Sequence, residues 1–197
     1  MRPKGSGRNG QIRYLDENER LRFMKEAQKD KMTDLAFSLT LSFGLRVGEL
    51  AAIRLSDINF DAKEIFVKAM KGGREKHHPL SDKLIKKIKS WLRVRKKLRT
   101  EGGNDYLFPG RFVGSHYSRD GFQLIFKRLC DKVGIENHSI HDLRHTSAIM
   151  LVEQGEHVVD IRDRLRHRSL QSTEVYLQIV NNRKAEIRQN QMFDKIF

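Results

Sequence analysis

Residues 141–145 read HDLRH and bring two histidines, an arginine and an aspartate into five positions. His141 and His145 are four residues apart, a spacing that puts two imidazoles on one helix face and occurs in zinc sites. His141 and Arg144 would also share a face and could bind an anion together. Asp142 could instead cap a helix that begins here. The segment therefore fits a metal site, an anion site or a capped helix.

The metal interpretation is the weakest of the three. A zinc-binding HExxH segment has a glutamate beside the first histidine, and this chain has Asp142 there. Arg144 would also place a positive charge next to the metal ion. We therefore expect no metal here, and the alternative to an anion site is structural, with Asp142 capping the helix and the histidines bonded to backbone groups.

Two further segments place reactive side chains at element boundaries. FGLRVGEL has Arg46 directly after an apolar segment and a glycine, and LRHRSLQSTEVYLQ has His167 nine residues before Tyr176. Phosphoryl transfer to a protein side chain requires cations, an acid for the leaving oxygen and an in-line nucleophile. A tyrosine, with a free pKa of roughly 10, needs such surroundings to attack at neutral pH. No acidic cluster suggests Mg²⁺, so we expect chemistry without a metal or other cofactor.

The charge of the chain favours a polyanionic partner. The 197 residues fit one domain and include 39 Lys and Arg against 25 Asp and Glu, a formal net charge of +14. Such an excess attracts DNA or RNA. Residues 71–99 hold 12 basic and two acidic residues with apolar positions at helical spacing, and their cationic face either is solvated or faces phosphates. Cys130, the single cysteine, is expected to be a small buried thiol.

The periodicity of apolar residues predicts a mainly helical α+β fold with a small antiparallel sheet near residues 58–80. A strand at 65–67, the turn KGGR and the segment HHPL predict a β-hairpin, and residues 106–109 are expected to be extended. No run of 18 apolar residues or signal peptide is present, so we expect no membrane span and a cytoplasmic, nucleoid-associated protein. Helices are predicted at 16–29, 33–43, from 46, 81–99, 119–133, 141–154, 157–165, around Tyr176 and at 181–192.

Four segments in order resemble the motifs of the tyrosine recombinases, the phage-integrase and Xer-like family. GLRVGEL resembles the first arginine box, KGGREKHHPL the lysine hairpin, HDLRHTSA the His-x-x-Arg box and LRHRSLQSTEVYL the His-to-Tyr segment. The resemblance covers roughly residues 14–180. It implies a catalytic domain at 14–180, which we expect to follow a basic flexible tail at 1–13 and to precede a helical tail at 181–197.

The resemblance assigns roles to individual residues. Arg46 and Arg144 would grip the scissile phosphate, and Tyr176 would attack it. Lys71, chosen by its spacing from Pro79 rather than the neighbouring Arg74 or Lys76, would protonate the leaving 5′ oxygen. The resemblance also implies proton transfer at the tyrosine for His141 and a phosphate contact for His167. Glu49 would orient the first arginine or, alternatively, lie exposed on a helix, and His145 would have a supporting, structural role. We further expect DNA contacts from the basic side chains of Arg74, Lys76, Arg166 and Arg168.

Two departures from the family pattern concern backbone and length. The family usually has glycine before the second histidine, and here Arg166 takes that place, where we expect it to adopt an ordinary backbone conformation and to contact DNA. Only about 13 residues precede the expected catalytic domain, whereas typical members carry an N-terminal helical domain. The chain is then either a fragment of a longer integrase or a short stand-alone member, as the fimbrial phase-variation invertases are.

The implied function is site-specific DNA strand exchange through a 3′-phosphotyrosine, without metal or ATP. The implied partners are double-stranded DNA with paired inverted core sites and three further copies of the chain, which without DNA would be a monomer or weak oligomer. The tail would pack into a neighbouring copy or onto its own. The alternatives are a DNA-binding regulator that does not cut, a type IB topoisomerase and a basic RNA-binding protein.

Overall fold

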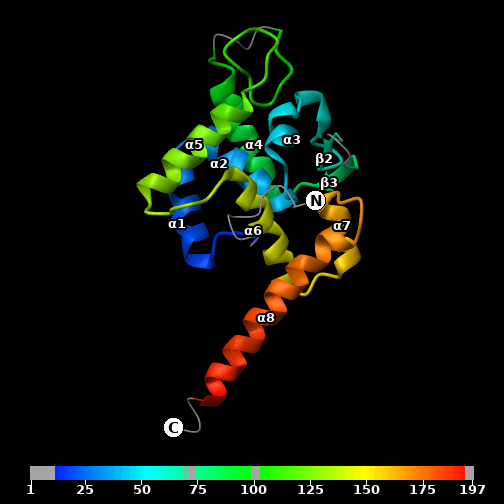
Figure 1. The fold of residues 1–197 in the computed structure, drawn as a ribbon. Coiled ribbons are helices and arrows are strands. Elements are labelled where there is room, and N and C mark those ends of the chain that lie inside the picture. Colours follow the sequence, from blue (N-terminus) through cyan, green and yellow to red (C-terminus); the bar gives the residue numbers. More distant parts are fainter. Residues whose placement is uncertain (1–11, 69, 71–73, 99–102, 194–197) are drawn as a thin grey trace.

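The computed structural model of the chain describes residues 12–68, 70, 74–98 and 103–193 (Figure 1). The fold is mainly helical with one small antiparallel sheet, as the sequence predicts. Along the chain the described elements are α1 (Glu17–Ala27), α2 (Lys31–Phe43), α3 (Val47–Ala52), a 3₁₀ turn (Leu55–Asp57), β1 (Ile58–Asn59), β2 (Glu64–Val67), β3 (Lys76–Pro79), α4 (Asp82–Arg95), α5 (Arg119–Lys132), α6 (Ile140–Glu153), α7 (Val158–Leu165) and α8 (Gln171–Phe193).

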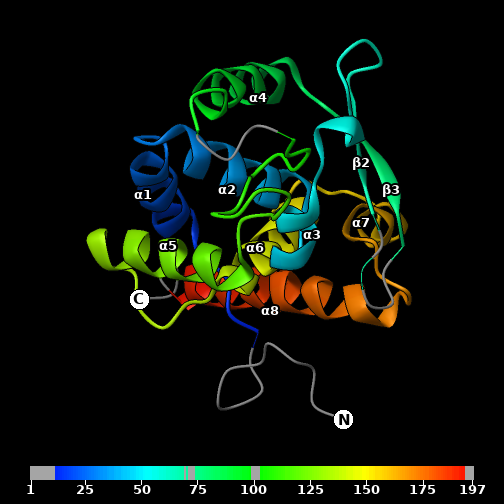
Figure 2. The same ribbon diagram turned by 90° about the horizontal axis from the view of Figure 1, so that it is seen from above.

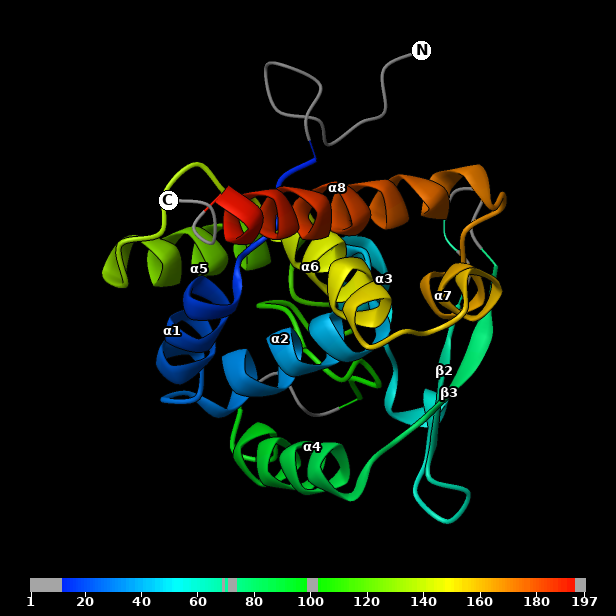
Figure 3. The same ribbon diagram turned by 90° about the horizontal axis from the view of Figure 1, so that it is seen from below.

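Four helices form the centre of the molecule. Figures 2 and 3 show α4, α2, α6 and α8 side by side in that order, with α1 and α5 at one end and α7 at the other. α2 is buried along most of its length because its sequence is apolar on most faces. It ends at Gly44, whose φ of 57° is the left-handed conformation common at helix ends. The chain then turns directly into α3, so that Arg46 lies where the two helices meet.

The three strands pair in the order β1, β2, β3. In the β2–β3 pair, Ile65 lies opposite His78 and Val67 opposite Lys76. The alternation of β2 buries Ile65 and Val67, whereas on β3 His78 is the buried residue. Figures 2 and 3 show this hairpin beside α7. The sheet therefore presents an imidazole toward the helical part of the fold.

The buried apolar residues fall into two clusters. The larger one joins α1, α2, the sheet, α4 and α5. The smaller one lies between α6, α7 and α8, and Tyr176 belongs to it. In the described part of the chain, no helix has the length and apolar character that crossing a bilayer requires.

The predicted break between a helix around Tyr176 and a helix at 181–192 is wrong. The sequence predicts one short helix around Tyr176 and another at 181–192, but α8 runs without interruption from Gln171 to Phe193. No glycine or proline lies in this stretch, and Asn costs a helix only roughly 0.7 kcal/mol relative to Ala. Its later half projects beyond the rest of the fold in Figure 1 and is largely exposed. The predicted tail is therefore a continuation of the helix that carries the tyrosine.

Two smaller predictions concern the start of α6 and residues 106–109. Asp142 does cap α6, but from its third position: the helix begins after Ser139, and an Asp142 carboxylate oxygen accepts a bond of 2.9 Å from the Ser139 backbone N–H. The predicted extended stretch at 106–109 is not a continuous strand: Tyr106 and Pro109 make isolated bridges to Arg54 and His116, and residues 107–108 between them form a bend.

Candidate active site

Arg46 and Glu49 form the first part of the site at the start of α3. The Arg46 guanidinium donates a bond of 2.7 Å to Glu49 Oε1, and the Arg46 backbone N–H donates one of 2.8 Å to Oε2. The Glu49 side chain is fully buried, whereas the Arg46 side chain is 35% exposed. Burial excludes the alternative of an exposed helix glutamate. Arg46 thus keeps an accessible guanidinium on a fixed support.

Arg144, the fifth residue of α6, reaches the same place. Its guanidinium donates to the carbonyl oxygens of Gly44 and Leu165, the latter at 2.5 Å. Its Nη1 also lies 3.9 Å from Glu49 Oε2. The side chain is 2% exposed, and burial together with the Arg46 charge lowers its pKa to about 9. The two predicted phosphate-binding arginines therefore meet around one carboxylate.

Arg166 is a third guanidinium in this place, and both predictions for it need correction. Its φ of 58° is left-handed, not ordinary, a conformation that costs a residue with a Cβ roughly 1–2 kcal/mol. Its side chain is fully buried, so it does not reach a DNA surface, and it donates a bond of 2.6 Å to Glu49 Oε2. By turning inward, the Arg166 guanidinium pairs with the buried Glu49 carboxylate. An outward side chain at this position would not make this ion pair.

Tyr176 lies in the first turns of α8 and is 3% exposed. Its hydroxyl is 2.8 Å from Nδ1 of His145, on α6. Burial raises the pKa of Tyr176, although the guanidinium groups of Arg144 and Arg46 act to lower it. Burial also lowers the pKa of His145 to about 4, so this imidazole is neutral near pH 7 and available as a hydrogen-bond acceptor.

The sequence predicts a different histidine beside the tyrosine. The ring of His141 contacts the ring of His145 edge to face, with centroids 4.8 Å apart, while the described hydrogen-bond partner of the Tyr176 hydroxyl is His145. The helical geometry explains this. Residues four apart lie about one helical turn apart along α6, and His145 is the one whose turn faces Tyr176 on α8. His141 is half-buried and lies nearer the start of α6.

His167 lies on the other side of the tyrosine. Its ring stacks on the Tyr176 ring with centroids 6.3 Å apart and planes 15° apart. Its Nδ1 is 2.9 Å from the Thr173 hydroxyl, which fixes the ring. Burial and the nearby arginines lower the pKa of His167 to about 3, so its ring is also neutral. Thr173 has no motif that would have identified it from the sequence.

The remaining predicted residues lie apart from this cluster or outside the description. Lys71 lies outside the described residues. Arg74, Lys76 and Arg168 are exposed, and Arg74 lies 4.0 Å from Asp163. Their exposure leaves these side chains accessible for the predicted DNA contacts.

His78 belongs to the site although no sequence prediction singled it out. It is 2% exposed on β3, stacks on Phe43 with centroids 4.8 Å apart, and its Nε2 is 2.8 Å from Arg166 Nη1. Burial and the Arg166 charge lower its pKa to about 3. Its position opposite buried Ile65 in the predicted hairpin was the signal that could have identified an inward side chain.

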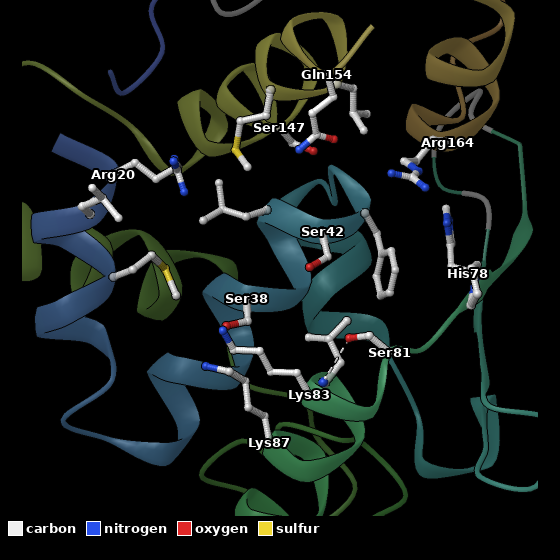
Figure 4. Close-up of a pocket in the computed structure, with 18 of the residues that line it drawn as sticks. Arg20, Ser38, Ser42, His78, Ser81, Lys83, Lys87, Ser147, Gln154 and Arg164 are labelled. Atoms are coloured by element: carbon white, nitrogen blue, oxygen red, sulfur yellow. Dashed lines mark hydrogen bonds between the residues drawn. The ribbon is translucent and has the colours of Figure 1, made fainter. Parts of the chain in front are cut away.

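A cavity of about 540 Å³ lies behind this cluster, between α1, α2, α4 and α6 (Figure 4). In the figure His78 and Arg164 line one side of it and Arg20 the opposite side, with Lys83 and Lys87 along the lower edge. Tyr176 and the arginine pair do not line it. The cavity is thus distinct from the tyrosine site, with His78 on the wall between them.

Three guanidinium groups share one carboxylate at this site. Within the described ion pairs, the carboxylate partner of Arg46, Arg144 and Arg166 is in each case Glu49. Burial acts to raise the pKa of Glu49, but Arg166 and the other bonded groups outweigh it and the pKa is lowered, so the carboxylate is charged. An excess of positive charge therefore remains beside Tyr176, as an anion site requires. In the described residues no group of three or more His, Cys, Asp or Glu is arranged to hold a metal ion.

The chain matches a family model over most of its length. The model described as the phage integrase family matches residues 13–183. The tyrosine recombinase XerC of Corynebacterium glutamicum is 32% identical over 75% of this chain and 47% of its own length. The tyrosine recombinase XerA of Pyrococcus furiosus is 32% identical over 84% of this chain and 57% of its own length. The chain thus spans about half the length of these relatives.

Solved structures share the fold. The crystal structure of the XerA recombinase superposes with a TM-score of 0.73 at 29% identity, over 83% of this chain and 59% of that one. The XerH site-specific recombinase bound to its palindromic difH substrate, in a post-cleavage complex, superposes with a TM-score of 0.75 at 22% identity, over 89% of this chain and 52% of that one.

Proposed function

Because the chain belongs to the phage integrase family, we propose that it is the catalytic part of a site-specific DNA recombinase that cuts and rejoins DNA through a 3′-phosphotyrosine. The observation that carries the proposal is the cluster of three arginines around one carboxylate, next to a tyrosine hydroxyl already bonded to a neutral imidazole. A DNA phosphate supplies the negative charge that this cluster lacks. We propose a domain at 14–180 with its helical extension from 181.

The proposed reaction is a phosphoryl transfer. The Tyr176 oxygen bonds to phosphorus while the bond from phosphorus to the 5′ oxygen breaks. Arg46 and Arg144 bind the non-bridging oxygens, and a tautomer of His167 with hydrogen on Nε2 adds a donor. Lys71 gives its proton to the leaving 5′ oxygen, a role that rests on the family resemblance alone. A 5′ hydroxyl from the partner duplex reverses the step, so no ATP is consumed.

The proton of Tyr176 passes to His145 in this proposal. His145 Nδ1 is the group in contact with the hydroxyl, and its neutral ring can accept. Tyr176 is 3% exposed, so side chains over it have to move before a phosphate reaches its oxygen. We propose that the tyrosine and His145 remain paired during that movement, because α6 and α8 pack along each other.

The proposed substrate is double-stranded DNA with two inverted core sites, held by a tetramer of this protein. The XerH recombinase structure bound to its palindromic difH substrate supports DNA as the partner, and the net charge of +14 supports a polyanion. Without DNA we propose a monomer or weak oligomer. With such a substrate the protein would work in the cytoplasm, at the nucleoid.

A nicked suicide substrate tests the proposal. Such a DNA loses a short fragment after cleavage, so the phosphotyrosyl complex cannot reverse and accumulates as a slow band in a denaturing gel. We expect this band with the natural chain and none with Tyr176→Phe, whereas Tyr106→Phe serves as the matched control and should retain it. DNA binding without a covalent band would favour the regulator that does not cut.

Plasmid relaxation separates the remaining alternatives. A type IB topoisomerase would relax supercoiled DNA of any sequence, whereas a recombinase is expected to act only on DNA that carries its core sites. An RNA-binding protein would form no covalent complex with either DNA.

A further inference from the structure

We propose that Arg166 is a positioning residue that sets Glu49, and through it Arg46 and Arg144, and ties them to the hairpin strand β3. The inference rests on the proposed function, because its measured effect is on cleavage. Arg166 occupies a position where the family pattern has glycine, so its side chain is an addition to the site in this chain.

The backbone at Arg166 shows that its side chain matters to the fold. The residue is left-handed at the end of α7, with φ 58° and ψ 38°, where glycine would be relaxed. It is also among the largest fully buried side chains in the described chain. A strained backbone under a buried charge persists only where the contacts of that side chain compensate for both.

The contacts of Arg166 join four elements of the fold. Its Nη1 donates to the Phe43 carbonyl oxygen at 3.1 Å and to the Arg164 carbonyl oxygen at 3.0 Å. The same nitrogen lies 2.8 Å from His78 Nε2, and Nη2 donates to Glu49 Oε2 at 2.6 Å. The guanidinium thus connects the end of α2, the end of α7, strand β3 and helix α3.

The bond to Glu49 determines what the other two arginines can do. Glu49 Oε2 accepts from Arg166 and from the Arg46 backbone, and Arg144 Nη1 is 3.9 Å away, outside hydrogen-bond distance. Without Arg166, this oxygen would lose its strongest partner and move toward Arg144. The Glu49 carboxylate and the DNA phosphate would then compete for Arg144.

The bond to His78 links the site to the hairpin. His78 is neutral, so its Nε2 can accept from a guanidinium, and stacking on Phe43 holds the ring. The segment between β2 and β3 contains Lys71, the proposed acid. Strand β3 follows Lys71 in the chain. Arg166 therefore connects this strand to Glu49, the carboxylate that also holds Arg46 and Arg144.

A set of variants tests the proposal by single-turnover cleavage of the suicide substrate at saturating protein. Arg166→Gly suits the left-handed backbone and removes the whole buried side chain, including the guanidinium. We expect the cleavage rate to fall by about tenfold or more, the difference that one charge-assisted hydrogen bond makes. The protein concentration at half-maximal DNA binding should stay within about twofold, because the side chain does not face DNA.

Two controls separate positioning from stability. Asn137→Gly relaxes another left-handed residue, which is exposed, and should cleave at the natural rate. In the second control, Glu49→Ala with Arg166→Gly should be no slower than Glu49→Ala alone, because Arg166 acts through Glu49. Millimolar guanidinium should restore cleavage to Arg166→Gly but not to the double variant.

The possible outcomes are distinct. If Arg166→Gly is folded and cleaves at the natural rate, or if its effect simply adds to that of Glu49→Ala, the inference is wrong. If Arg166→Gly does not fold, the same comparison with Arg166→Lys, which keeps a charge but cannot bridge His78 and Glu49, decides the question. If the natural chain itself forms no covalent complex with core-site DNA, the proposed function fails first.

Discussion

The two histidines of HDLRH differ in what they contact, and this difference predicts different effects on the reaction. His145→Ala removes the group bonded to the Tyr176 hydroxyl, whereas His141→Ala removes a half-buried ring beside it. We expect His145→Ala to slow formation of the covalent complex by about 10²-fold or more, within the range of general-base effects, and His141→Ala to slow it less. Single-turnover cleavage rates measure both.

A conservative variant shows whether the effect is one of proton transfer. His145→Gln keeps a polar side chain of similar reach but cannot take a proton at neutral pH. It should cleave as slowly as His145→Ala. A His145→Ala variant that cleaves as fast as the natural chain would mean that the contact with Tyr176 is lost before the chemical step.

The sequence predicts the reactive residue types better than it predicts their partners. The residue types in three segments predicted a common anion site, and the family resemblance singled out Arg46 and Arg144. The structure places these two arginines around Glu49. The inward turn of Arg166 could not be predicted, because it depends on a contact between residues 117 positions apart. The choice of His145 over His141 likewise depends on how α6 packs on α8.

At the scale of the element, α8 leads to a prediction about assembly. Ile187 and Met192 are 49% and 66% exposed on its projecting half. If this half packs against a neighbouring copy on DNA, changing both to lysine should weaken the assembly of two core-site duplexes. The stability of the isolated chain should change little, by about 0.5 kcal/mol or less, because surface substitutions rarely do more. Gel-shift assays of paired-site complexes and thermal unfolding measure the two effects.

The matched control is Glu186→Lys with Arg188→Glu, which alters charge on the same exposed stretch without removing apolar surface. It should assemble as the natural chain does. Loss of thermal stability in the Ile187 and Met192 variant, with assembly unchanged, would show that this half of α8 packs on its own chain instead.

The positions of most elements could be predicted because capping and periodicity are local properties. Asp16 and Ser81 begin α1 and α4 as their side chains suggest, and the hairpin forms where turn residues separate two strands. The false break at Asn181 has a different origin. An asparagine pair is a weak signal, and only contacts along α6 show that the helix continues.

At the scale of the whole molecule, three buried histidines predict acid sensitivity. The pKa is lowered to about 3 for His78 and His167 and to about 4 for His145, from an ordinary value of 6.5, chiefly by burial. The unfolded chain therefore binds more protons than the folded one below pH 6.5. Above that pH these histidines do not reduce the free energy of unfolding. Below it, each histidine lowers the free energy of unfolding by roughly 1.4 kcal/mol per pH unit as the pH falls toward its folded pKa.

Denaturant unfolding at pH 7.5, 6 and 5 measures this slope. His78→Phe keeps an aromatic ring that cannot ionise. We expect it to reduce the slope of unfolding free energy against pH by the contribution of about one proton. His77→Gln, on the exposed neighbouring position of β3, is the matched control and should retain the natural slope. A natural chain whose stability is constant over this range would contradict the prediction.

The burial of Cys130 makes it possible to label α8 at a single position. It is the single cysteine of the chain, and burial raises the pKa of its thiol to about 12, which makes it inert toward thiol reagents. A cysteine introduced on the exposed half of α8, as in Gln189→Cys, would then be the one readily labelled thiol. A fluorophore or spin label there could report in real time when this helix meets a second copy of the chain.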